Sequence, residues 1–193
     1  LIYLDSAATT LQKPISVFEA MERAARTLAS PGRGGYTPAM DAADTVFACR
    51  EEVANLFHVT DPGHVVFTFN ATHGLNIAIR TLVRPSARVL ISGFEHNAVT
   101  RPLQAIGADI AVARAPLFRS DEAAEVFDHL ITPETRAVVC SHVSNVFGYI
   151  LPVEEMAAMC RDRGIPFGMD AAQSAGSLKI DMEALGADFI AMP

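Results

Sequence analysis

The sequence predicts a three-layer α/β/α domain built on a mostly parallel sheet. From residue 64 onward, short apolar runs rich in β-branched residues alternate with segments of helical periodicity. These runs are apolar almost throughout, as strands covered on both faces require. Because a helix joins each pair of successive strands, we expect right-handed crossovers in a mostly parallel sheet. The 193 residues suffice for one such domain, or for a domain with a short appendage.

Two longer helices are predicted before this region, at residues 14–28 and 38–57. Each begins with a proline, Pro14 or Pro38, at the first helical position, where the missing N–H is tolerated. Thr37 is the expected N-cap of the second helix.

The strands and helices of the alternating region follow one another at short intervals. The strands are expected at residues 64–69, 88–92, 110–113, 136–141, 166–170 and 188–192. The helices are expected at residues 72–83, 97–106, 121–131, 153–163 and 181–185. The last strand reaches Pro193 without a closing helix, so we expect an N-terminal arm over residues 1–13 and a large domain over residues 14–193 that is incomplete at its C-terminus.

The composition excludes several classes of protein. Half of the residues are apolar and only 19% are charged, with a mean hydropathy of +0.25, which excludes disordered chains. The 15 basic and 22 acidic side chains give a net charge of −7, so we expect no nucleic-acid partner.

The sequence also bears on location. No apolar run approaches the length of a membrane span, and the first residues lack the features of a signal peptide, so we expect a cytoplasmic protein without a membrane partner. The cysteines are Cys49, Cys140 and Cys160, whose odd number and wide spacing fit neither a disulfide framework nor a CxxC zinc site.

Polar residues follow four of the predicted strands directly. Thr72 follows the first strand, His96 the second, and Asn145 the strand at 136–141, while Asp170 and Gln173 come at the end of the strand at 166–170. In a parallel sheet, ligands bind beyond the carboxyl ends of the strands, where loops and helix N-termini converge. We therefore expect these side chains to line one crevice.

Each of these residues has a purely structural alternative. Thr72 is a possible helix N-cap, His96 a possible surface or capping histidine, and Asn145 a possible Asx-turn residue before Gly148. Asp170 is harder to explain in this way, because carboxylates are rarely buried unless paired. The convergence of all four positions favours a small-molecule site.

The chemistry of the set favours a phosphorylated heteroaromatic aldehyde. A helix N-terminus at Thr72 suits a phosphate, and His96 offers a flat face for ring stacking. Asp170 is able to keep a pyridine nitrogen protonated, and Asn145 or Gln173 to bond a phenolic oxygen. Pyridoxal phosphate has all of these groups.

Five motifs in this order carry a resemblance to a known family. They cover residues 3–10, 67–76, 95–99, 141–148 and 170–176. With them the whole chain is similar to the N-terminal half of class V aminotransferases, the large domain of pyridoxal-phosphate fold type I, and specifically to the cysteine desulfurase branch. The sequence departs from the family's usual pattern at Ser6, His73 and Pro193.

The resemblance implies roles for individual residues. Ala71, Thr72 and His73 would bind the cofactor phosphate, and His96 would stack on the ring and take part in catalysis. Asp170, the second catalytic residue, would pair with the pyridinium. Asn145 and Gln173 would reach the phenolic oxygen.

It also implies the reaction and the partners. The expected enzyme is pyridoxal-phosphate dependent and converts L-cysteine to alanine, leaving a persulfide on the enzyme. A small amino-acid substrate, a homodimer and a sulfur-acceptor protein are the expected partners. The Schiff-base lysine and the persulfide cysteine belong to the family's sequence beyond the position of Pro193, so we expect these 193 residues alone to be inactive.

Alternatives stay open at this point. Within the family these are a selenocysteine lyase or an aminotransferase; outside it, a non-catalytic α/β module that binds a phosphorylated ligand or a partner protein. A nucleotide-binding Rossmann domain is disfavoured, because Gly74 and Gly93 form no GxGxxG motif.

Three further residue sets have weaker functional readings. Lys179 precedes the last strand, so we expect it at the opposite edge of the sheet, away from the site. Cys140 and His142 share a face at one strand end but have no further metal ligand nearby. Cys49 and Cys160 fall on helical patterns and are expected to be packed hydrophobes.

Overall fold

The computed structural model describes residues 2–193. The chain divides into two compact units, one ending at Val66 and the other beginning at Phe67. The boundaries of the expected arm (residues 1–13) and large domain (residues 14–193) stay a prediction. The two units are described separately.

The first unit is helical. It contains α1 (Ile15–Thr27), α2 (Thr37–Phe57) and the short 3-10 helix η1 (Pro62–His64), which packs against α2. The N-cap of α2 is Tyr36, in the extended conformation, and Thr37 is the first helical residue. The predicted Thr37 cap is therefore wrong by one position, because the helix accommodates Pro38 anywhere in its first turn, where no N–H is required.

The second unit is a five-stranded sheet with helices. All strands are parallel, in the order β2-β1-β3-β4-β5. The strands are β1 (Arg88–Ser92), β2 (Asp109–Ala113), β3 (Thr135–Ser141), β4 (Phe167–Asp170) and β5 (Phe189–Ala191). The helices are α3 (Ala71–Leu82), α4 (Asn97–Ile106), α5 (Ser120–Leu130), α6 (Val153–Asp162) and α7 (Met182–Leu185).

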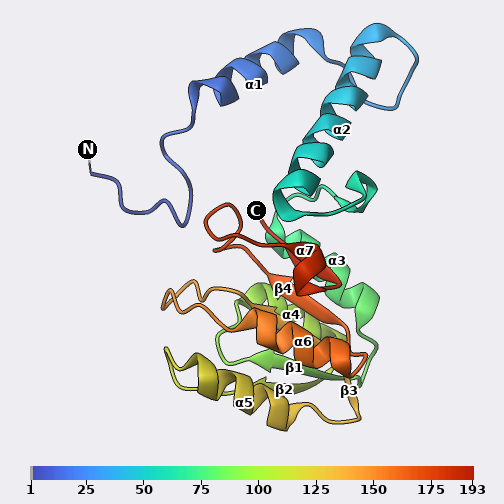
Figure 1. Cartoon of the computed structure of the whole chain (residues 1–193). Helices are drawn as coiled ribbons and strands as arrows, with labels where there is room; N and C mark the ends of the chain where they lie inside the picture. The colour runs from blue at the N-terminus through green and yellow to red at the C-terminus, as the bar shows by residue number, and fades with distance from the viewer. Residues whose placement is uncertain (1) are drawn as a thin grey trace. The chain divides into compact units, whose positions relative to one another are not determined.

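The helices form two layers around this sheet, α3 and α4 on one face and α5 and α6 on the other (Figure 1). Successive residues of β3 show the two faces. Val139 belongs to the core cluster with Leu75 of α3 and Leu103 of α4. Cys140 points the other way, with its Sγ 3.8 Å from the Sδ of Met156 in α6. The predicted three-layer α/β/α class is confirmed.

The strand order places a topological switch point between β1 and β3. The chain leaves β1 through α4 toward β2 on one side, and it leaves β3 through α6 toward β4 on the other side. Connections that leave two adjacent strands in opposite directions open a gap at the carboxyl ends of those strands, which is where ligands bind in such sheets.

One predicted strand is absent. Of residues 64–69, His64 ends η1 and residues 65–69 form an irregular segment, in which Val66 is 70% and Phe69 92% exposed. The apolar, β-branched composition favours an extended backbone, and Val65 has φ −83° and ψ 117°, but a strand also requires a hydrogen-bonded neighbour. None of the strands within residues 2–193 pairs with this segment.

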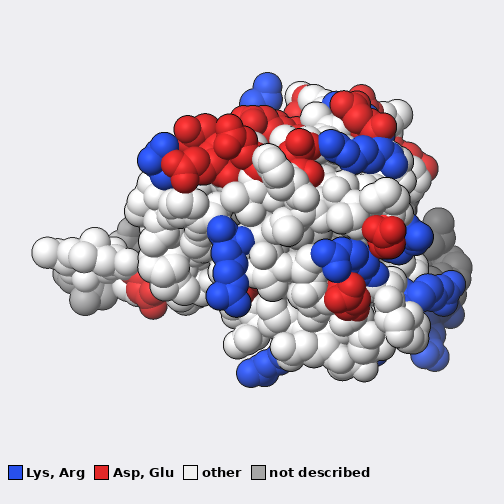
Figure 2. All heavy atoms as spheres, turned by 90° about the horizontal axis from the view of Figure 1, so that it is seen from below, with Lys and Arg blue, Asp and Glu red and all other residues white. Residues whose placement is uncertain are grey.

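The surface is mixed in charge. Acidic side chains gather along one side of the face seen in Figure 2, while the basic ones are dispersed among uncharged residues. Ion pairs such as Arg163 with Asp128 join α5 to the end of α6. Within residues 2–193, no helix combines the length and the apolar character needed to cross a bilayer.

Candidate active site

The N-terminus of α3 presents unused backbone donors. The Oδ1 atom of Asn70 accepts a hydrogen bond from the N–H of His73 at 2.8 Å, which makes Asn70 the N-cap. The alternative that Thr72 is the cap is therefore wrong. The N–H groups of Ala71 and Thr72 lie in the first turn, where no intrahelical acceptor exists, and Thr72 is exposed. An anion would be held well at this position.

His73 is already engaged within the protein. Its Nδ1 accepts a hydrogen bond from the N–H of Phe69 at 3.4 Å, and the two rings stack with centroids 5.3 Å apart. Its own N–H is bonded to Asn70. His73 thus connects the segment before α3 to the helix. The expected contact of His73 with the phosphate stays a prediction, and Nε2 is the ring nitrogen that remains available for it.

His96 begins α4 directly after β1. Its Nδ1 accepts a hydrogen bond from the N–H of Ala98 at 3.1 Å, so the imidazole is the N-cap of α4 and the capping alternative is observed. His96 is nevertheless exposed. Capping uses one ring nitrogen and leaves the face of the ring able to pack on a ligand.

Asp170 ends β4 in a buried position, with 6% of its surface exposed. Its Oδ1 accepts a hydrogen bond from the N–H of Ala172 at 3.0 Å, and no donor within residues 2–193 reaches Oδ2. Burial raises the pKa of Asp170, while the Ala172 N–H and the nearby His96 lower it in part. A buried carboxylate with one unbonded oxygen suits a cationic N–H donor such as a pyridinium.

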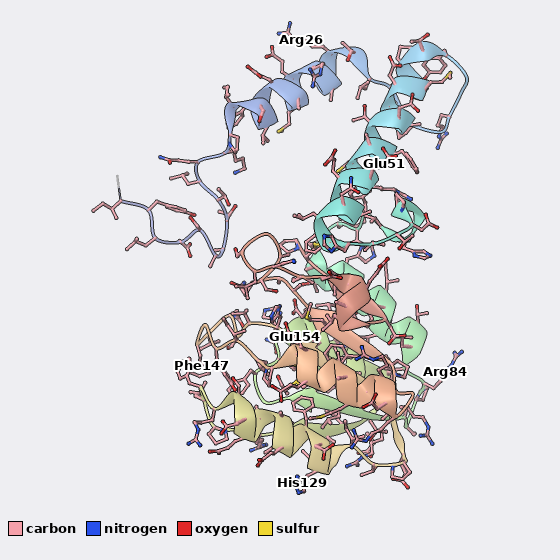
Figure 3. The ribbon with its side chains drawn as sticks, in the orientation of Figure 1. Arg26, Glu51, Arg84, His129, Phe147 and Glu154 are labelled. Atoms are coloured by element: carbon pink, nitrogen blue, oxygen red, sulfur yellow. The ribbon has the colours of Figure 1, made fainter. Side chains whose placement is uncertain are left out.

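Asn145 and Gln173 lie in the turns that follow β3 and β4. The turn after β3, which contains the labelled Phe147 of Figure 3, is closed by Ser144, whose Oγ accepts hydrogen bonds from the N–H groups of Val146 and Phe147 at 3.3 Å. The Asx-turn alternative for Asn145 is therefore wrong. Within the described chain, neither the Asn145 nor the Gln173 side-chain amide forms a hydrogen bond, so both can bond a ligand.

The main chain holds these turns close to Asp170. The N–H of His142, directly after β3, donates to the carbonyl of Asp170 at 2.9 Å. A Cβ atom built on Gly74 of α3 would lie 3.8 Å from the Cβ of Ala191 in β5, which places the first turns of α3 beside the end of the sheet. Three strand ends and one helix N-terminus thus converge, instead of the four strand ends that the sequence predicted.

Glu95 is a residue of this region to which sequence reasoning gave no role. Its Oε1 is hydrogen-bonded to the hydroxyl of Ser92 and accepts the N–H of Ser141 at 2.8 Å, and its Oε2 accepts the Ser141 hydroxyl at 2.9 Å. Burial raises the pKa of Glu95 to about 7; the serine bonds oppose this and the charge of Asp170 adds to it. The sequence feature that could have indicated a role for Glu95 is its position between a buried strand and His96, a candidate ligand-binding residue.

The cysteines differ in their surroundings. Cys140 and Cys160 are buried, and burial raises the pKa of both, that of Cys160 to about 12. Cys49 is exposed on α2, so the expectation that it is packed is wrong. The helical pattern placed it on a helix but did not determine which face is covered. Cys140 and His142 are not joined by a third metal-ligating side chain within residues 2–193.

Comparisons with known proteins point to one family. Residues 2–193 match the family described as aminotransferase class-V. A probable cysteine desulfurase of Halalkalibacterium halodurans is 33% identical over 199 residues, which cover 99% of this chain and 49% of the relative. The chain spans about half the length of the curated relatives it matches.

Solved structures share the fold over the same half. The apo cysteine desulfurase of Thermococcus onnurineus superposes with a TM-score of 0.85 at 27% identity, covering 99% of this chain and 49% of that one. A cystine C–S lyase in complex with its reaction product, cysteine persulfide, superposes with a TM-score of 0.80 at 27% identity, covering 93% and 49%. With the family match over residues 2–193, these similarities show that the chain belongs to the class V aminotransferases.

Proposed function

We propose that this chain binds pyridoxal 5'-phosphate and that the protein is a cysteine desulfurase. The observation that carries the proposal is the buried Asp170, with one carboxylate oxygen unbonded and the exposed His96 ring near it. When bound, pyridoxal phosphate supplies an electron sink for a carbanion at the Cα of an amino acid. The names of the relatives support cysteine as that amino acid.

The residues of the chain divide the work of binding. The N–H groups of Ala71 and Thr72 hold the phosphate at the positive end of α3. His96 packs against the ring, and Asp170 keeps the ring nitrogen protonated through a charge-assisted hydrogen bond. Asn145 and Gln173 offer amide donors to the phenolic oxygen. Because Asp170 is buried, its charge acts in a poorly screened environment.

The thiol that receives sulfur is not one of the buried cysteines. A thiolate is the attacking species, and burial raises the pKa of both Cys140 and Cys160. In the overall step, the C–S bond of L-cysteine breaks, an enzyme thiol takes the sulfur as a persulfide, and alanine is released. A sulfur-acceptor protein then removes the outer sulfur atom.

Assembly and location are further parts of the proposal. A homodimer is supported by α1, none of whose residues is buried although Ile15, Phe18 and Met21 are apolar and 53–71% exposed. A cytoplasmic location is supported by the three cysteines, which are all unpaired thiols, since oxidising compartments favour disulfides.

Binding of pyridoxal phosphate to the wild-type protein, followed by calorimetry, tests the cofactor assignment. Pyridoxal without its phosphate is the matched ligand and should bind more weakly, because the α3 N-terminus then has no anion to hold. A protein that binds neither ligand would refute the proposal. Alanine formation from L-cysteine, with an added thiol reductant that frees the persulfide sulfur as sulfide, tests the reaction in the whole protein, and preference for L-cystine would assign the protein to C–S lyases instead.

A further inference from the structure

At the switch point between β1 and β3, the carboxyl group of Glu95 joins the two strand ends. Glu95 lies in the connection from β1 to α4, and its oxygens bond Ser92 at the end of β1 and both the N–H and the hydroxyl of Ser141 at the end of β3. The Ser92 hydroxyl also accepts the N–H of Phe94 at 3.1 Å. The two strands whose connections diverge are thus joined at their carboxyl ends by one side chain.

This bridge touches both sides of the proposed cofactor site. His96 is the next residue after Glu95 and caps α4. Ser141 is the register partner of Asp170 in the β3–β4 pair, and the following residue, His142, donates its N–H to the Asp170 carbonyl. A displacement of the Glu95 carboxyl would therefore be transmitted to His96 along the chain and to Asp170 across the sheet.

We propose that Glu95 is a positioning residue, which fixes the placement of His96 relative to Asp170 so that a flat ring fits between the imidazole and the carboxylate. This proposal rests on the proposed function, since it assigns a role within the same cofactor site. Glu95 itself touches no reacting atom; it acts through Ser92, Ser141 and the backbone.

The bridge also connects cofactor binding to pH. The titratable groups that interact with Glu95 are Asp170 of β4 and Cys140 of β3. His96 is the next residue in the chain and interacts with Asp170. The negative charge of Asp170 favours the neutral form of Glu95. A cationic ring bound at Asp170 compensates that charge, so the anionic form of Glu95 becomes more favourable and a proton is released near neutral pH. Binding is therefore strengthened as the pH rises.

Two variants separate the geometry from the charge. Glu95→Gln keeps an oxygen for the Ser141 N–H and an amide that can donate to the serine hydroxyls, but it removes the charge. Glu95→Ala removes the bridge altogether, and Ser141→Ala removes one of its bonds without changing charge. Glu125→Gln, at an exposed position of α5, is the matched control for loss of a carboxylate.

The first measurement is the affinity of the folded protein for pyridoxal phosphate at several pH values. We expect Glu95→Ala to weaken binding roughly ten-fold or more, with Ser141→Ala between it and the wild type, and Glu125→Gln to leave binding unchanged. The affinity of Glu95→Gln should be close to that of the wild type at low pH and should become weaker than that of the wild type as the pH rises. Because variant and wild type are compared at the same pH, the titration of the ligand itself affects both equally.

The second measurement needs no cofactor. NMR chemical shifts of the His96 ring, assigned with His96→Asn, should move in Glu95→Ala and stay near their wild-type values in Glu95→Gln. Wild-type protein that fails to bind pyridoxal phosphate overturns the proposed function, while the His96 shifts still decide whether Glu95 positions this ring. Unchanged shifts, or unchanged affinity, in folded Glu95→Ala or Ser141→Ala would overturn the proposal for Glu95.

Discussion

His96 and Asp170 are electrostatically coupled across the carboxyl edge of the sheet. His96 lowers the pKa of Asp170, against the larger effect of burial, which raises it. One residue comes from the connection after β1 and the other from the end of β4, with β3 between these two strands. A ligand that contacts both residues must therefore reach from the end of β1 to the end of β4, and changes in either residue should alter its binding.

Asp170→Asn should weaken pyridoxal phosphate binding by roughly 10- to 100-fold. The variant keeps the shape of the side chain and the acceptor for the Ala172 N–H, but it loses a charge-assisted hydrogen bond, which contributes about 1.5–3 kcal/mol. Calorimetric titration measures the change. Asp121→Asn, on the exposed start of α5, is the control, and equal affinity of Asp170→Asn and wild type would show that Asp170 has only a structural role.

His96→Ala should weaken binding less, because aromatic stacking contributes about 0.5–1.5 kcal/mol beyond the buried area. Alanine also removes the cap on Ala98, which costs about 0.5–2 kcal/mol of helix stability. His96→Asn separates the two effects, since asparagine caps well but has no ring. We expect it to retain the melting temperature and to lose the stacking part of the affinity; full affinity in His96→Asn would exclude stacking.

Much of the fold could be predicted because its signals are local. β1 and α4 begin and end where the sequence places them, with Gly107 in the left-handed conformation at the end of α4 (φ 74°). The prediction of a strand at residues 64–69 was wrong because a strand requires a hydrogen-bonded neighbouring strand, and the local composition does not show whether one is present. The caps at Tyr36 and Asn70 were missed by one and two positions. The Tyr36 side chain forms no cap hydrogen bond, so its residue type does not mark the cap, and before α3 both Asn70 and Thr72 are residue types that can cap.

The position of several candidate site residues could also be predicted. Asp170, His96 and the start of α3 do gather at one edge, as the rule for parallel sheets requires. The role of Glu95 could not be derived, because its partner Ser141 lies 46 residues away and a loop glutamate is ordinarily solvated. Only the strand order, with β1 next to β3, brings the two together.

The stability of the ligand-free protein should fall as the pH rises through neutrality. The folded-state pKa of Glu95, about 7, lies above its ordinary value of 4.5, so the folded protein binds a proton that the unfolded chain has released. The resulting stabilisation is complete below about pH 4.5 and is lost as the pH rises through about 7. Asp170, whose pKa is also raised, acts in the same direction.

Denaturant unfolding of wild type and Glu95→Gln at about pH 5 and pH 8 measures this effect. The free energy of unfolding of the wild type should fall by roughly 2–3 kcal/mol relative to Glu95→Gln over that interval, as an upper value. Parallel pH profiles of the two proteins would show that Glu95 titrates normally. Glu125→Gln should follow the wild type.

Gly168→Ala should destabilise the second unit and disturb the site. Gly168 of β4 is the register partner of Phe189 in β5, and a Cβ atom at Gly168 would overlap the Phe189 ring. Overpacking of this kind costs about 1–3 kcal/mol, and because Asp170 lies two residues further along β4, affinity for pyridoxal phosphate should decrease too.

Gly74→Ala is the matched control, since its added Cβ would meet Thr68 Oγ1 at 3.5 Å, an ordinary contact. In α3 that change should stabilise by about 0.5–1 kcal/mol. Thermal unfolding compares the two variants, and a Gly168→Ala protein as stable as the wild type would mean that Phe189 does not pack over this position.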